Sequence, residues 1–159
     1  MKTTMKTVCL AMAALLLIVA TAMASPLVGG GDKGGDESME RELEGGIHAT
    51  FVGAFRDRDD DYIYFRFIVE PQQDTTLKIG GDSAFDNNGN EFDGPRYTYI
   101  GDEYATSREI IGGIKTPVTF RYDIDASYGT PLLTRMTFYF NGKELVFRNV
   151  QVQDAAKEE

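Results

Sequence analysis

The clearest hydrophobic pattern in the chain is a strict alternation over residues 62–70, which read YIYFRFIVE. Successive side chains of a β-strand point to opposite faces of a sheet, so this alternation predicts a strand with one apolar and one polar face. The segment is rich in aromatic and β-branched residues, and Pro71 follows it directly. We therefore expect a central strand that places four side chains in the core: Ile63, Phe65, Phe67 and Val69.

Weaker alternation marks further strands on either side of this segment. We expect strands over residues 47–55, 75–79, 97–100, 109–111, 118–124, 132–140 and 143–152. In the first of them, Phe51 and Phe55 are predicted to share the core face. No segment has a convincing helical period, which indicates an all-β domain.

Two Asn-Gly dipeptides predict tight hairpin turns, because both central residues of a type I′ turn need positive φ. At residues 88–89 the turn would set Phe85 opposite Phe92. At residues 141–142 it joins the last two strands. The pairs expected from this second turn are Phe138 with Leu145, Met136 with Phe147 and Arg135 with Arg148. The first two of these pairs bring apolar side chains together on one face, so turn chemistry and hydrophobic pattern agree.

Seven to nine short strands with frequent turn signals favour an immunoglobulin-like antiparallel β-sandwich, with a jelly roll or small barrel as the alternative. Four segments match the pattern of a known domain family. They are an Asp-x-x-Gly-Asn-x-aromatic hairpin, formed by Asp86, Gly89, Asn90 and Phe92, and the segments 115–120, 132–140 and 147–150. Through these segments, residues 47–152 resemble the telokin-like, immunoglobulin-like domains of uncharacterised bacterial secreted proteins. The resemblance implies a β-sandwich and transfers no functional residue.

The chain begins with two lysines, an apolar run over residues 8–19 and small residues before Ser25, which is the pattern of a secretory signal peptide over residues 1–24. The single cysteine, Cys9, lies inside this leader, which favours a bacterial protein that is secreted or periplasmic and has no disulfide. Residues 25–46 are rich in glycine and acids, so we expect a flexible tether in which residues 37–44 form at most a transient helical turn. Residues 47–152 would then form the domain, and residues 153–159 a frayed polar tail.

The chain is acidic, with 25 Asp and Glu against 16 Lys and Arg and a formal net charge of −9. Two of the lysines belong to the predicted leader, so the mature protein would be more negative still. Such a charge repels nucleic acid, which we therefore exclude as a partner. After cleavage of the leader no membrane span is expected, because no later segment has the roughly 20 apolar residues that a span needs.

Two acidic loops are candidate calcium sites, since Ca²⁺ takes six to eight oxygen ligands on a flexible frame. The candidate ligands are Asp57, Asp59 and Asp61 in the first loop and Asp86, Asn88 and Glu91 in the second. The second loop is not an EF-hand, because Glu91 stands where that loop requires Gly and Tyr97 where it requires Glu. Acidic residues in such loops are also common turn formers.

Catalytic patterns are not evident in the sequence. His48 is the only histidine and is predicted on the outward face of its strand, and no serine stands in a G-x-S-x-G setting. We therefore predict a protein that is not an enzyme and needs no cofactor, calcium excepted.

Large side chains on the outward faces of the predicted strands are candidates for an interaction face. These residues are Tyr62, Tyr64, Arg66, Arg135 and Arg148. Exposed tyrosine and arginine suit the hot spot of a protein interface or the stacking of a sugar. If Arg135 and Arg148 are cross-strand neighbours, their like charges need a carboxylate from this chain or, failing that, from a ligand or partner.

Together these observations favour a secreted, non-enzymatic, immunoglobulin-like binding or interaction module whose partner is a protein or a component of the cell envelope. The alternative is a calcium-dependent or carbohydrate-binding module that uses the acidic loops and the tyrosine and arginine residues. The sequence leaves the oligomeric state open.

Overall fold

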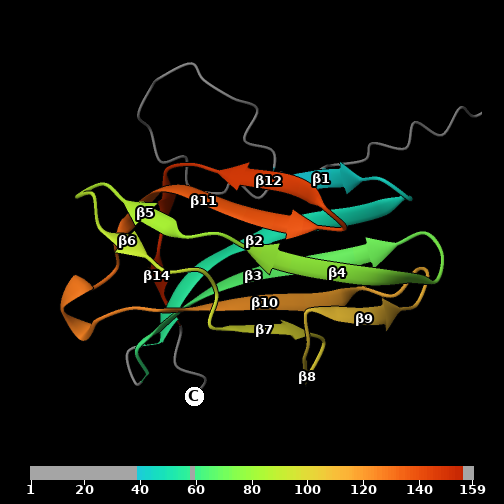
Figure 1. The fold of residues 1–159 in the computed structure, drawn as a ribbon, viewed down its shortest axis with the longest axis horizontal. Helices are drawn as coiled ribbons and strands as arrows, with labels where there is room; N and C mark the ends of the chain where they lie inside the picture. Colours follow the sequence, from blue (N-terminus) through green and yellow to red (C-terminus); the bar gives the residue numbers. More distant parts are fainter. Residues whose placement is uncertain (1–38, 58–59, 156–159) are drawn as a thin grey trace, which may run out of the picture. The chain divides into compact units, whose positions relative to one another are not determined.

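The computed structural model describes residues 39–57 and 60–155, so the predicted signal peptide and most of the predicted tether lie outside the described residues. Fourteen strands and one short 3₁₀-helix occupy this part of the chain (Figure 1). They are β1 Glu40–Leu43, β2 Ile47–Asp57, β3 Tyr62–Pro71, β4 Thr75–Gly81, β5 Ala84–Asp86, β6 Glu91–Phe92, β7 Tyr97–Ile100, β8 Glu103–Tyr104, β9 Ser107–Ile110, β10 Thr116–Asp123, η1 Ala126–Tyr128, β11 Leu132–Phe140, β12 Lys143–Phe147, β13 Val150–Gln151 and β14 Gln153–Asp154.

The strands form two sheets, and the predicted all-β antiparallel sandwich is confirmed. The first sheet has the order β1-β2-β3-β10-β7-β8, so β3 is central as expected; β14 adds one parallel pair against β2. The second has the order β6-β5-β11-β4-β9, with β12 and β13 also paired to β11. Figure 1 shows β11 running between β12 and β5. There are more strands than the seven to nine expected, because the predicted strand over residues 143–152 is interrupted and several further strands are only two residues long.

The core lies between the two sheets and is rich in phenylalanine. The four side chains predicted from the alternation in β3 are at most 1% exposed. The Phe67 ring lies 5.0 Å from the rings of both Phe51 and Phe138 and 5.1 Å from that of Phe140, measured between centroids. Each such aromatic pair adds about 0.5–1.5 kcal/mol to the burial of its surface. The core therefore fixes which face of β3 and β10 remains outside.

Two predicted flexible segments contain strands instead. Residues 40–43 lie inside the predicted tether, but they form β1, which pairs antiparallel with β2, so neither a tether nor a helical turn describes them. Residues 153–154 lie inside the predicted frayed tail, but they form β14, which pairs with β2 near Arg56. Both strands complete backbone hydrogen bonds at the edge of β2, which is a long-range interaction that composition does not reveal.

The two Asn-Gly turns differ. Asn141 and Gly142 have φ of 50° and 81°, and the predicted pairs Phe138 with Leu145 and Met136 with Phe147 are confirmed. At residues 88–89 only Gly89 has positive φ, and Phe92 opposes Ala84 rather than Phe85. The expected register of this first hairpin is therefore wrong by one residue.

The predicted pairing of Arg135 with Arg148 is also wrong. Strand β12 ends at Phe147, and Asn149, with φ of 54°, interrupts the strand before β13. Arg135 instead pairs with Phe85 of β5. Neither arginine forms an ion pair with a carboxylate of the described residues, so the expected structural ion cluster is not formed.

Candidate functional site

A continuous array of tyrosines and arginines covers part of the outer face of the first sheet. We call it the tyrosine face, and it consists of Tyr62, Tyr64 and Arg66 on β3, Arg121 on β10, Tyr97 and Tyr99 on β7, and Tyr104 on β8. Strand alternation places these side chains opposite the buried ones, and the pairing of β10 with both β3 and β7 sets Arg121 between Tyr64 and Tyr97. Four strands from three separate parts of the chain, β3, the β7–β8 hairpin and β10, therefore build one surface.

Arg121 is the centre of this face. Its guanidinium carbon lies 4.2 Å from the ring centroid of Tyr62, 5.1 Å from that of Tyr64 and 5.5 Å from that of Tyr97. It also donates hydrogen bonds to the Tyr99 hydroxyl at 3.3 Å and to Asp60 at 3.4 Å. Cation–π contacts of this kind contribute about 0.5–2 kcal/mol each, depending on how far the cation is desolvated.

The tyrosine rings meet edge to face. The angle between ring planes is 72° for Tyr62 and Tyr97, 68° for Tyr97 and Tyr104, and 65° for Tyr99 and Tyr104. Tyr104 is the most exposed of the large apolar or aromatic side chains in the described part of the chain, at 67%. The face therefore offers hydroxyl groups and ring edges over most of its area and one open ring at Tyr104.

Arg66 owes its surroundings to a β-bulge in β2. The ladder between β2 and β3 pairs Phe51 with Phe67 and then Gly53 with Arg66, so Val52 is the extra residue. The bulge reverses the alternation and turns Phe55 outward, which corrects the prediction that Phe51 and Phe55 share the core face. The Phe55 ring centroid lies 5.3 Å from the Arg66 guanidinium, and that of Tyr64 lies 5.9 Å from it.

Tyr64 connects the tyrosine face to the loop before β3. Its hydroxyl donates a short hydrogen bond to the Asp60 carboxylate, which also receives Arg121. Burial and this hydrogen bond raise the pKa of Tyr64 to about 12. The phenol therefore stays protonated and remains a hydrogen-bond donor at neutral pH.

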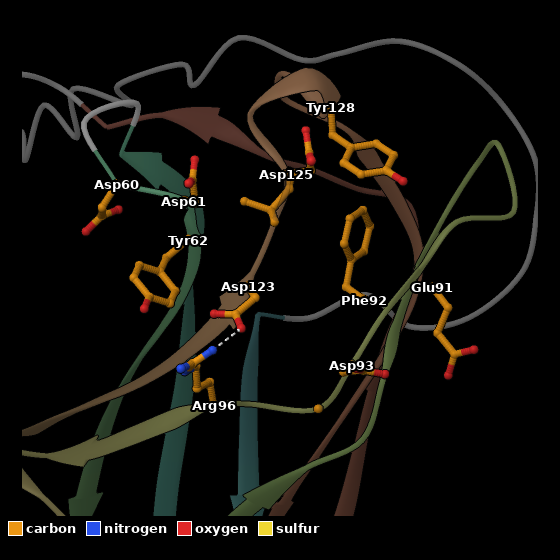
Figure 2. Close-up of a pocket in the computed structure, with 12 residues that line it drawn as sticks. Asp60, Asp61, Tyr62, Glu91, Phe92, Asp93, Arg96, Asp123, Asp125 and Tyr128 are labelled. Carbon is orange, nitrogen blue, oxygen red and sulfur yellow. Dashed lines mark hydrogen bonds and ion pairs between the residues drawn. The ribbon is translucent and has the colours of Figure 1, made fainter.

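An acidic pocket adjoins the tyrosine face, and Tyr62 belongs to both (Figure 2). Its volume is about 900 Å³. Six carboxylates line it, namely Asp60, Asp61, Glu91, Asp93, Asp123 and Asp125. Arg96 pairs with Asp123 at 2.8 Å, and this hydrogen bond raises the arginine pKa. Figure 2 shows the rings of Phe92 and Tyr128 together on the other side of the pocket, with centroids 5.4 Å apart.

The predicted calcium ligands fall into different places. Asp61 and Glu91 line the acidic pocket, whereas Asp57 lies on β2 and does not, and Asp59 is outside the described residues. Asp86 instead closes its own turn: its Oδ1 accepts the N–H groups of Asn88 and Asn90 at 2.8 Å, and its Oδ2 accepts the Asn90 amide. Burial alone would raise the pKa of Asp86, but these hydrogen bonds outweigh it and lower the pKa.

Metal-binding geometry is not found in the described ranges 39–57 and 60–155. Within them, no group of three or more His, Cys, Asp or Glu side chains is placed to hold a metal ion. His48 lies half-buried on the outward face of β2, as predicted, beside Glu70 and Lys115.

The sequence grouped five residues as one interaction face, and the structure divides them. Tyr62, Tyr64 and Arg66 belong to the tyrosine face, whereas Arg135 and Arg148 are exposed residues of the second sheet and the β12–β13 connection. Sequence reasoning missed Tyr97, Tyr99 and Tyr104 as members. Tyr97 and Tyr99 are two positions apart, which indicated that they share one face of a strand. Only the pairing of β7 with β10 shows that this face continues the one that carries Tyr62 and Tyr64.

Comparison with known proteins gives no identification: no protein-family model matches the chain, and no curated protein matches it significantly. Among the described residues, no helix combines the length and apolar character needed to cross a membrane.

Proposed function

We propose that this chain is a secreted or periplasmic binding module that is not an enzyme and that contacts a protein partner through the tyrosine face. The observation that carries the proposal is the array of five tyrosines around Arg121 on an outer sheet face. Tyrosine and arginine are, with tryptophan, the residues enriched in interface hot spots, and tyrosine loses little conformational entropy on binding. The sandwich would be of the immunoglobulin-like, telokin-like kind, in which two antiparallel sheets pack over one core.

A protein partner suits this face better than a sugar does. A pyranose ring stacks on an open, flat aromatic face, but Arg121 already covers the ring of Tyr62 at 4.2 Å. The neighbouring rings stand at 65–72° to one another and present their edges. Only Tyr104 offers an open ring, so carbohydrate binding is the alternative that the experiment must separate.

The experiment uses the chain without its predicted leader, immobilised and exposed to an extracytoplasmic extract of its own source and to a glycan array. Tyr104→Ala removes the exposed ring of the tyrosine face, and Tyr128→Ala is the matched control, because Tyr128 is 40% exposed on η1. We expect a protein whose purified form binds the wild type and Tyr128→Ala about equally. A hot-spot loss of about 2 kcal/mol should weaken its binding to Tyr104→Ala roughly thirtyfold.

Three results would contradict the proposal. Equal binding by both variants would remove the tyrosine face from the interaction. A saturable glycan ligand whose binding is lost in Tyr104→Ala would favour the carbohydrate alternative. Turnover of glycoside, ester or peptide substrates that stays with the purified protein would show that the chain is an enzyme.

A further inference from the structure

The two arginines of the tyrosine face, Arg66 and Arg121, differ in whether a carboxylate of this chain pairs with them. Arg121 pairs with Asp60 at 3.4 Å. Two arginines outside the face are also paired, Arg96 with Asp123 at 2.8 Å and Arg108 of β9 with Glu103 at 3.2 Å. Arg66 is exposed and forms no ion pair with any described residue. In a chain with 25 acidic residues, Arg66 is thus the one arginine of this face that has no carboxylate partner among the described residues.

The two positions directly opposite Arg66 supply no carboxylate. Across the ladder it faces Gly53 of β2 on one side and Thr119 of β10 on the other. Neither can neutralise a guanidinium.

The Arg66 guanidinium contacts two aromatic rings, and no hydrogen bond from it to a described residue is found. Phe55 and Tyr64 contact it through their rings, at 5.3 Å and 5.9 Å. Phe55 reaches this position only because the bulge at Val52 and Gly53 turns it outward. A ring face accepts no conventional hydrogen bond, so the N–H groups of Arg66 remain available to an acceptor.

We propose that Arg66 is the anchor of the tyrosine face for a carboxylate, an Asp or Glu side chain of the protein partner. This inference rests on the proposed function, since it supplies the charge that the partner must bring to that face. A carboxylate accepts two parallel N–H bonds from a guanidinium fork, and a fork already held by two rings loses less freedom on binding. The partner's contacts with the tyrosines would surround this ion pair and exclude water from it.

The test uses two capped tripeptides as probes, acetyl-Tyr-Glu-Tyr-amide and acetyl-Tyr-Gln-Tyr-amide, which differ only in one carboxylate. Nuclear magnetic resonance of the Arg66 Nε–H group and of the tyrosine rings follows each titration. We expect saturable shifts at Arg66 with the glutamate peptide and an affinity about two- to fivefold above that of the glutamine peptide.

Variants then assign that preference to Arg66. Arg66→Gln should abolish it, and Arg66→Lys should reduce it, because lysine keeps the charge but loses the planar fork and its stacking. Arg148→Gln is the matched control, since Arg148 is an exposed arginine away from the tyrosine face, and it should keep the preference.

The outcomes separate this inference from the proposed function. If both peptides shift the tyrosine rings with equal affinity, the carboxylate anchor is wrong while binding at the tyrosine face stands. If the preference survives in Arg66→Gln, or if Arg148→Gln removes it equally, the carboxylate is bound elsewhere and the inference is overturned. If neither peptide shifts Arg66, the anchor is likewise overturned, and the tyrosine face is then judged by the binding of Tyr104→Ala alone.

Discussion

The outer faces of the two sheets carry the same residue types in different arrangements. On the first sheet, Arg66 and Arg121 both lie against aromatic rings. On the second, Arg135 is exposed, and no described aromatic ring stacks with it. Each face also has a tyrosine that donates to an aspartate, Tyr64 to Asp60 and Tyr139 to Asp82. Composition alone therefore does not distinguish the face that we propose to bind from the face that we do not.

The two outer faces differ in how many strands bring aromatic rings and arginines together. The tyrosine face draws on β3, β10, β7 and β8 in adjacent positions, and the bulge in β2 adds Phe55. A guanidinium can then contact rings on two sides at once. On the second sheet, Arg135 of β11 pairs with Phe85 only at a shift in register, where β5 is three residues long. The tyrosine face thus depends on the alignment of strands that lie apart in the sequence.

Straining the β-bulge in β2 should have the largest effect on the difference between the two outer sheet faces. Gly53 has φ of 151°, and a Cβ there would lie 3.0 Å from the Phe55 ring. We expect Gly53→Ala to lower the free energy of unfolding by about 1–3 kcal/mol, measured by urea denaturation, and to displace the ring from Arg66. Gly80→Ala is the control on the second sheet, because its Cβ would meet Tyr139 at an ordinary 3.9 Å. Equal losses in both variants would mean that the bulge needs no glycine.

Arg121 and Arg135 provide the next comparison. Arg121→Gln removes three ring contacts and the ion pair with Asp60, so we expect a loss of about 1–2 kcal/mol in the free energy of unfolding. Arg135→Gln should change it by less than about 0.5 kcal/mol, as for most exposed positions. Thermal and urea unfolding of the two variants measure both values. Similar losses would show that stacking on the tyrosine face contributes little to stability.

The parts of the fold that the sequence predicted are those with local causes. Burial along β3 follows from a period of two, and the turn at Asn141 and Gly142 follows from positive φ at both residues. The same dipeptide at residues 88–89 behaves differently because Asp86 accepts the N–H groups of Asn88 and Asn90 and so forms a longer turn. Turn chemistry is therefore set by neighbours of the dipeptide as well as by the dipeptide itself.

The candidate site was predicted only in part because its assembly is non-local. Alternation correctly placed Tyr62, Tyr64 and Arg66 on one face, but it gave no information on which strand lies beside β3. Gly53 inside a predicted strand was a possible signal of a bulge, and without it Phe55 was assigned to the wrong face. The two acidic loops do meet at one pocket, yet Asp123 reaches it because β10 pairs with β3.

The smallest expected effect concerns the two tyrosine–aspartate pairs and has no consequence at neutral pH. The pKa of Tyr64 is raised to about 12 first by burial and then by Asp60, whereas the hydrogen bond to Asp82 is the first cause of the raised pKa of Tyr139. We expect Asp60→Asn to lower the Tyr64 pKa only in part, and Asp82→Asn to remove most of the rise at Tyr139. A folded-state pKa above the unfolded value gives stability that is complete below about pH 10 and is lost as pH rises through the folded pKa. Ultraviolet titration of the tyrosines in both variants and the wild type tests this. If Asp60→Asn removed a larger fraction of the rise at Tyr64 than Asp82→Asn removes at Tyr139, burial would not be the first cause of the raised Tyr64 pKa.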